Sequence, residues 1–235
     1  MPPSRGPEKK DEPMAVPRQP ILNVPQPVGV LLVATFVLHV IRLSLPGYLD
    51  DAAIRRFGFI PAHVLSWWSG GEGTGPFDAL APFVTHIFIH ADFTHLILNM
   101  IWLLPFGAVV ARRLGGTATF YVFYLLTGAI GALTYFFFYP SLNSPLVGAS
   151  GAISGLMGGA VRFMFTGGWG PLTPLTDSRV VLFTVVFLLV NVVFGSVSLG
   201  FGGNAIAWQA HIGGYLAGLL LLGVFDRRAR RGPFA

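Results

Sequence analysis

The stretch PLVGASGAISGLMGGAVRFMF, residues 145–165, is apolar enough to lie in a bilayer and yet carries two serines and several glycines. A segment that only had to dissolve in lipid would consist mainly of Leu, Val and Ile, which transfer most easily into hydrocarbon. The serines and glycines therefore need separate reasons. Close packing of helices accounts for such glycines, whereas a hydroxyl group at this place indicates a structural hydrogen bond or chemistry.

The whole chain has the composition of a membrane protein. Of its 235 residues, 53% are hydrophobic and only 11% are charged, whereas roughly a quarter of the residues of an average soluble domain are charged. Charged residues are absent from long runs, as expected because an ionised group in the middle of a bilayer is costly. The chain has no cysteine, which excludes disulfides, thiolate nucleophiles and Cys-ligated metals.

Six apolar segments are long enough to cross the hydrocarbon core, which takes about 20 helical residues. They are residues 27–45, 94–111, 117–139, 146–166, 179–199 and 205–225. We therefore predict an all-α, polytopic membrane protein, with a bundle of six transmembrane helices over residues 25–226. The connection at 46–93 contains aromatic residues that favour the membrane interface, so we expect it to rest on the outer leaflet as short helices.

The basic residues predict the orientation of the bundle. Lys and Arg precede the first span and follow the second and sixth, whereas the connections 140–145 and 200–204 carry neither. We expect a disordered tail at 1–24, rich in Pro and charge, and a basic tail at 227–235, both cytoplasmic and belonging to a protein of the bacterial inner membrane. This topology explains the net charge of +5, so we expect membrane lipids around the protein and no nucleic-acid partner.

Polar residues collect near the outer ends of three spans that run in the same direction. His95 and Asn99 are one turn apart on the second span, and Ser150 and His211 on the fourth and sixth spans come out at similar depths, roughly 8–10 Å below the outer surface. A serine becomes nucleophilic when a neighbouring base takes its proton, and histidine suits this role near neutral pH. Because no acidic residue lies at this depth, the sequence predicts a Ser150–His211 dyad.

Attack on a carbonyl group also creates an oxyanion, which needs hydrogen-bond donors already in place. The imidazole of His95, the side-chain amide of Asn99 and the backbone N–H of Ser150 are candidate donors. They can act together only if the helices approach closely, and small residues four apart make the flat faces that permit this approach. The predicted packing glycines are Gly148, Gly151, Gly155, Gly214 and Gly218.

Three blocks of the sequence resemble motifs of the rhomboid family of intramembrane serine proteases: GASG at 148–151, AHIGGYLAG at 210–218 and HIFIHADFTHLILN at 86–99. The resemblance implies a serine endopeptidase that cleaves other membrane proteins in or next to their transmembrane segments. It implies Ser150 as the nucleophile and His211 as the base. It further implies that His95 and Asn99 bind the oxyanion, and that His86 and His90 organise the preceding loop. We expect no cofactor and no metal.

Other interpretations of the same residues remain open at the level of sequence. Ser150 could be a packing serine bonded to a carbonyl group one turn back, and the spacing of His86, His90 and His95 would suit a metal site. The four polar residues could line the path of a transporter or channel, or the chain could be a catalytically silent relative that binds membrane clients. Ser154 stands where some family members carry a tyrosine that stacks on the base, so the group that orients His211 is unassigned. Asn191, His39 and Arg42 are interpreted as structural or interfacial.

Overall fold

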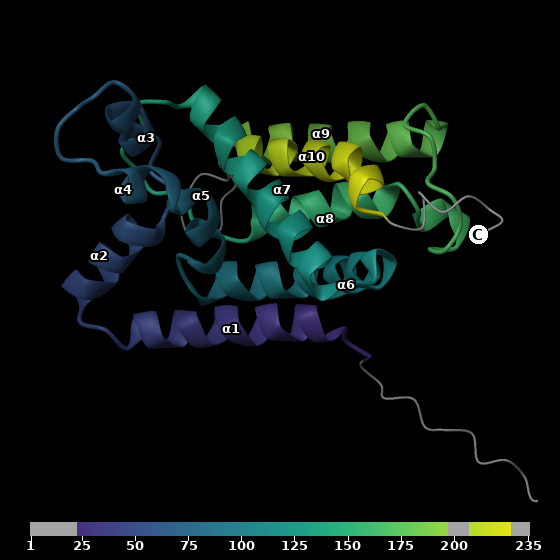
Figure 1. Ribbon diagram of the computed structural model, residues 1–235, viewed down its shortest axis with the longest axis horizontal. Helices are drawn as coiled ribbons and strands as arrows, with labels where there is room; N and C mark the ends of the chain where they lie inside the picture. The colour runs from purple at the N-terminus through teal and green to yellow at the C-terminus, as the bar shows by residue number, and fades with distance from the viewer. Residues whose placement is uncertain (1–22, 197–206, 227–235) are drawn as a thin grey trace, which may run out of the picture.

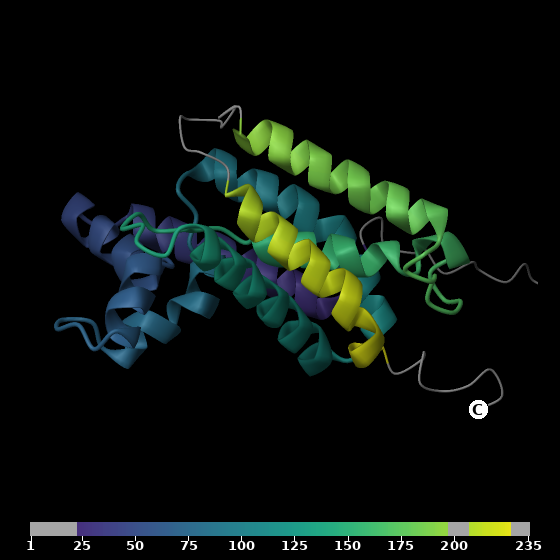
Figure 2. The ribbon, with the colours of Figure 1, turned by 90° about the horizontal axis from the view of Figure 1, so that it is seen from above.

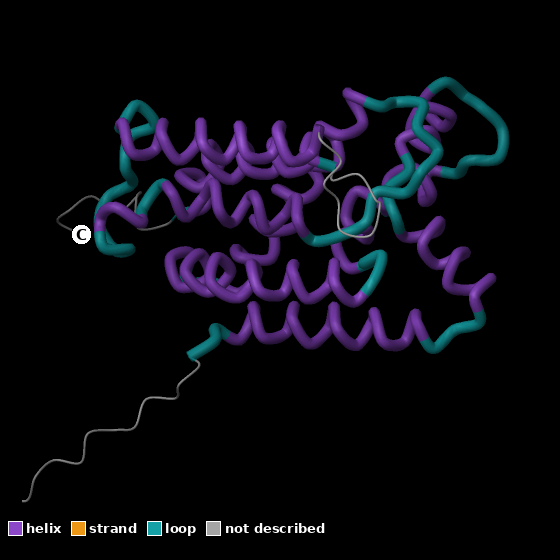
Figure 3. Tube along the Cα trace, turned by 180° about the vertical axis from the view of Figure 1, so that it is seen from behind, coloured by secondary structure: helices purple, strands orange, loops and turns teal. Residues whose placement is uncertain are grey.

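The computed structural model describes residues 23–196 and 207–226, so the tails predicted at 1–24 and 227–235 lie almost wholly outside the described residues, as does the connection at 200–204. Every regular element in the described part is a helix, apart from one isolated pair between Phe59 and Leu146 (Figure 3). The prediction of an all-α membrane protein is confirmed.

Six helices lie where the six spans were predicted, and short helices fill the loop between the first two. The six are α1 (Gln26–Leu43), α6 (Phe93–Leu114), α7 (Thr117–Phe138), α8 (Ser150–Val161), α9 (Ser178–Ser196) and α10 (Trp208–Phe225). The short elements are α2 (Gly47–Phe57), α3 (Pro61–Trp68), α4 (Pro76–Leu80), α5 (Pro82–Thr85) and the 3₁₀ turns η1 (His86–Phe88) and η2 (Met164–Thr166). Helices α2–α5 gather at one end of the bundle, and the start of α1 and the end of α10 lie at the other (Figure 1).

Helix α8 corrects the prediction of a regular span at 146–166. Among the described helices five are long and apolar enough to cross a membrane, and α8 is not one of them. Its 12 residues make a rod of roughly 18 Å at 1.5 Å per residue, whereas the hydrocarbon core is about 30 Å thick. The backbone before it is not helical, because Gly148 takes a φ of 116° in the left-handed half of the map.

A short helix and irregular backbone are tolerated at membrane depth only where protein surrounds them. Helix α8 meets this condition, because it packs against α6, α7 and α10 and ten of its twelve residues are buried. The apolar composition of Ser150–Val161 therefore reflects burial in protein rather than in lipid. As a consequence Ser150 is the first residue of its helix, not a residue about five positions past the start.

The contact between α8 and α10 depends on the predicted glycines. A Cβ atom on Gly214 would lie 2.0 Å from the carbonyl oxygen of Gly151, and one on Gly218 would lie 1.8 Å from that of Gly155. Each predicted pair therefore faces its partner across the interface. A further glycine that the sequence analysis did not single out, Gly158, has the same role, since its Cβ would meet the backbone oxygen of Tyr215 at 2.1 Å.

We predict that Gly218→Ala destabilises the protein although alanine favours helix formation. The added methyl group would meet a backbone atom that cannot swing aside, and overpacking of this kind costs roughly 1–3 kcal/mol. Thermal unfolding in detergent measures the effect. The matched control is Gly29→Ala on α1, where a Cβ meets nothing within 4 Å and the unfolding midpoint should stay level or rise. Equal midpoints for the two variants would contradict the role given to Gly218.

The loop helices are tied to the backbone that leads into α8. The N–H of Phe59 donates to the oxygen of Leu146 at 2.9 Å and the N–H of Leu146 donates back at 2.8 Å. Phe59 is fully buried, whereas the Trp68 side chain is 81% exposed. The expectation that the loop aromatics face the membrane interface therefore suits Trp68 and is wrong for Phe59, which holds the loop to the helical body.

Candidate active site

The structure brings Ser150 and His211 into direct contact. Ser150 begins α8 and His211 lies in the first turn of α10. The Oγ atom of Ser150 and the Nε2 atom of His211 are 2.8 Å apart. Both residues are half-buried, so the protein encloses most of the pair. A hydroxyl and an imidazole at this distance can exchange a proton.

The chain turns sharply just before Ser150, and the side chain of His95 on α6 fills the inside of the turn. A Cβ atom on Gly148 would lie 2.7 Å from the Nε2 atom of His95. The positive φ of Gly148 and this close approach both require glycine. His95 therefore lies beside the turn that carries Ser150, and its own backbone N–H is held by the Asp92 carboxylate at 2.8 Å, which caps α6.

Two histidines of the preceding loop hold this turn in place. The carbonyl oxygen of His86 accepts the N–H of Gly148 at 3.0 Å, and the Nε2 atom of His90 accepts the N–H of Ala149 at 3.4 Å. Burial lowers the pKa of His86 to about 4 and that of His90 to about 3. Both rings are therefore neutral near pH 7, as His90 must be if its Nε2 atom is to accept a hydrogen bond.

A metal site formed by His86, His90 and His95 would require them to share one helical face, and they do not. His86 lies in the turn η1 and His90 in the segment before α6, so neither shares a helical face with His95. Within the described ranges, no group of three or more His, Cys, Asp or Glu side chains is placed to hold a metal ion.

Asn99 lies one turn along α6 from His95 and is buried. Its Nδ2 atom donates to the carbonyl oxygen of His95 at 2.7 Å. Its Oδ1 atom has no hydrogen-bond partner among the described residues. The structure thus places Asn99 against the backbone of His95 and shows no hydrogen bond between its amide and Ser150.

The start of α8 supplies further hydrogen-bond donors. The helical bonds begin with the N–H of Ile153, which donates to the oxygen of Ala149 at 2.9 Å. The preceding N–H groups, of Ser150, Gly151 and Ala152, belong to the helix end that has no internal acceptors and carries partial positive charge. Such an end binds anionic groups. A helix beginning at residue 146, as predicted, would have occupied the Ser150 N–H, whereas α8 begins at Ser150 and leaves this N–H without a helical acceptor.

Sequence reasoning missed one residue of the site. Asn191 on α9 was interpreted as structural or interfacial, and the structure places its Oδ1 atom 2.8 Å from the Nδ1 atom of His211. The signal was an amide side chain inside an apolar span, which is by default a functional candidate. His211 therefore lies between Ser150 on one side and Asn191 on the other.

The part of the chain that carries these residues matches a known protein family. The model of the Rhomboid domain matches residues 78–228, well over half of the chain. The chain belongs to the rhomboid family. The rhomboid match includes all three resembling blocks and the whole of α6 to α10, and it leaves out α1, α2 and α3.

The similar rhomboid proteins come from organisms that are distantly related to one another. The putative rhomboid protease YdcA of Bacillus subtilis is 30% identical over 178 residues, which are 73% of this chain and 82% of the relative. Rhomboid-like protease 3 of Toxoplasma gondii is 31% identical over 61% of this chain, and rhomboid protease GlpG of Salmonella newport is 27% identical over 66% of it. The matches cover only 51% and 54% of those two relatives.

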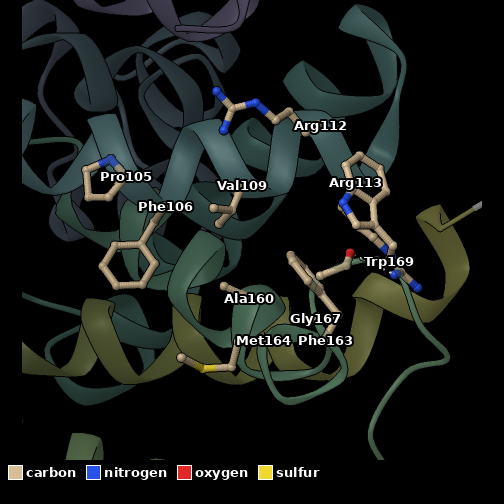
Figure 4. Close-up of a pocket in the computed structure, with 11 residues that line it drawn as sticks. Pro105, Phe106, Val109, Arg112, Arg113, Ala160, Phe163, Met164, Gly167 and Trp169 are labelled. Carbon is tan, nitrogen blue, oxygen red and sulfur yellow. Dashed lines mark hydrogen bonds between the residues drawn. The ribbon is translucent and has the colours of Figure 1, made fainter. Parts of the chain in front are cut away.

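This rhomboid domain also has an open cavity of about 420 Å³ that is separate from the candidate site. It lies between the second half of α6 and the segment after α8, and its lining includes Phe106, Val109, Phe163 and Trp169 (Figure 4). Phe163 is 13 residues beyond Ser150 along a mostly helical path, which separates the two by roughly 20 Å. The cavity therefore belongs to the opposite end of the bundle.

Proposed function

We propose that the protein is an intramembrane serine endopeptidase that cleaves the transmembrane segments of other membrane proteins. The observation that carries this proposal is the 2.8 Å contact between Ser150 Oγ and His211 Nε2, on a chain of the rhomboid family. A serine and a histidine from separate helices that meet at one depth are what nucleophilic catalysis requires. A transporter would have no need of this pairing.

In the proposed reaction, Ser150 Oγ attacks the scissile carbonyl carbon while its proton passes to His211 Nε2. The imidazolium then gives this proton to the leaving amine, which releases one part of the substrate and leaves an ester on Ser150. Water attacks the ester, and His211 again takes and returns the proton. The half-buried position of both residues fits a site that water can reach.

The negative oxygen formed during attack needs donors. The N–H of Ser150, at the positive end of α8, is the first candidate because it lies on the nucleophile itself. The imidazole of His95, which lies against Gly148, is the second. Asn99 can take part if a hydrogen of its Nδ2 group points toward the substrate, since the bond to His95 uses only one of the two.

The substrate must be a membrane segment that can unwind locally, because the carbonyl groups of an intact helix are already bonded within it. Small or helix-breaking residues near the cut should therefore favour cleavage. The protein would lie among the lipids of a bacterial inner membrane with both termini in the cytoplasm. The position of the start of α1 and the end of α10 at the same end of the bundle supports termini on one side (Figure 1).

A fluorophosphonate probe tests the nucleophile without knowledge of the natural substrate. We expect the parent protein in detergent to be labelled covalently and Ser150→Ala to remain unlabelled. Ser154 is the matched control, because it lies one turn further along the same helix and is buried, so Ser154→Ala should label at the parental rate. Labelling of Ser150→Ala would place the nucleophile elsewhere, and an unlabelled parent would indicate a catalytically silent relative.

A further inference from the structure

The imidazole ring of His211 is held on both sides. On the side away from Ser150, its Nδ1 atom lies 2.8 Å from the Oδ1 atom of Asn191. The amide of Asn191 is itself fixed, because its Nδ2 atom donates to the carbonyl oxygen of Phe187, one turn back on α9, at 2.9 Å. If the amide were turned over, its oxygen would face the Phe187 oxygen and two acceptors would meet. The orientation with Oδ1 toward His211 is therefore the one that the hydrogen bonds allow.

This orientation determines the tautomer of His211. The Oδ1 atom of Asn191 can only accept, so Nδ1 of the ring must carry a hydrogen. In the neutral ring the Nε2 atom then has a free lone pair, and Nε2 is the atom that lies 2.8 Å from Ser150 Oγ. The serine hydroxyl can thus donate to Nε2, as a base-assisted nucleophile requires.

We propose that Asn191 is the positioning residue of the site, holding His211 in the rotamer and tautomer that accept the proton of Ser150. This inference rests on the proposed function. In serine proteases a carboxylate has this role, and in papain-like proteases an asparagine has it. A neutral amide orients the imidazole without adding a negative charge to stabilise the imidazolium. Asn191 is thus the group that orients His211 in this chain, which has Ser154 where some family members have an aromatic residue.

The position of α9 makes a purely structural role the main alternative. Helix α9 lies at the edge of the bundle beside α10 (Figure 2), and only 11% of its membrane-length segment is buried. It contacts α10 through a second hydrogen bond, between Thr184 Oγ1 and Tyr215 OH at 3.1 Å, and through the stacked rings of Phe187 and Tyr215. Loss of Asn191 could therefore loosen α9 in addition to releasing His211.

Two substitutions of Asn191 separate these roles. Asn191→Leu keeps the approximate size and removes the acceptor. Loss of the partner that orients a metal-bound histidine lowers affinity or activity roughly 10- to 100-fold, and we expect a loss of similar size for His211. We expect this loss in kcat with KM nearly unchanged. Asn191→Asp keeps an acceptor toward His211 but loses the donor to the Phe187 oxygen, so its kcat should lie between that of Asn191→Leu and that of the parent. Its carboxylate favours the imidazolium form, so the acidic limb of the kcat/KM profile should move to higher pH. Among the described residues, His95 of α6 also influences the charge of His211. His95 is unchanged in both variants.

The matched control is Thr184→Val, which breaks the other α9–α10 hydrogen bond two turns away on the same face of α9. If Asn191 only tethers α9, this variant should lower kcat as much as Asn191→Leu. An equal loss would overturn the inference, and so would parental kcat in Asn191→Leu or an unshifted pH profile in Asn191→Asp. In each of these outcomes an inactive Ser150→Ala would leave the proposed function standing. An active Ser150→Ala would overturn both.

Discussion

Ser150→Ala and His211→Ala are each expected to abolish cleavage of a transmembrane substrate. In serine proteases the nucleophile and its base act as a unit, and removal of either lowers kcat by a factor on the order of 10⁴ to 10⁶. Here the two atoms are 2.8 Å apart and come from different helices, so removal of either residue breaks the contact on which proton transfer depends. The double variant should be no slower than the worse single variant, because either residue stops contributing to catalysis once its partner has been removed.

The measurement is the cleavage rate of a fluorescent transmembrane substrate by purified protein in detergent. Ser154→Ala, on the same helix, and His63→Ala, in the loop helix α3, are the controls for general effects of losing a hydroxyl or an imidazole. Both should cleave at close to the parental rate. Parental cleavage by Ser150→Ala or by His211→Ala would refute the proposed mechanism, whatever the controls do.

Most of the helical body could be predicted because a long uninterrupted apolar run has few possible structures other than a membrane-spanning helix. The predicted spans at 27–45, 94–111 and 117–139 differ from α1, α6 and α7 by at most three residues at either end. Helix α8 could not be predicted in the same way, since residues buried in protein and residues buried in lipid are both apolar. The break before Ser150 depends on the backbone of Gly148 and on its contact with His95, which come from tertiary structure.

The candidate site also has residues that could be predicted from the sequence and one that could not. Ser150 and His211 could be paired from the sequence, because both are polar residues near the same ends of the spans predicted at 146–166 and 205–225. Asn191 could not be assigned to them, because the rotation of α9 about its axis decides whether its amide faces α10 or lipid. The nearly uniform apolar surface of α9 gives no indication of that rotation in the sequence.

The buried position of Arg113 also could not be predicted from the sequence. Arg113 is one of the basic residues after the second predicted span, where an exposed arginine is expected, but its side chain is only 1% exposed. Its Nη2 atom lies 2.7 Å from the Asp226 carboxylate, which is fully buried. Its Nη1 atom donates to the carbonyl oxygens of Gly168 and Gly170. The arginine thus joins the end of α6, the loop after α8 and the end of α10.

We therefore predict that Arg113→Met strongly destabilises the protein. The change removes one member of a buried ion pair and leaves a carboxylate and two carbonyl oxygens short of donors, which typically costs about 3–5 kcal/mol. Unfolding in a denaturing detergent, followed by circular dichroism, measures the loss. The double variant Arg113→Met/Asp226→Leu should recover part of it, because the buried carboxylate that loses the guanidinium is then removed as well. Recovery should be incomplete, since Gly168 and Gly170 would still lack their donor.

The exposed pair Asp177–Arg179 is the control that separates burial from pairing. Hydrogen bonds from Arg179 hold the pKa of Asp177 at about 2, so this pair is also well formed, but the Arg179 side chain is 55% exposed. Solvent screens such pairs, and most contribute little to stability. Asp177→Asn should therefore leave the unfolding midpoint unchanged while Arg113→Met lowers it. If the two variants unfold alike, Arg113 does not stabilise this end of the bundle through its buried ion pair.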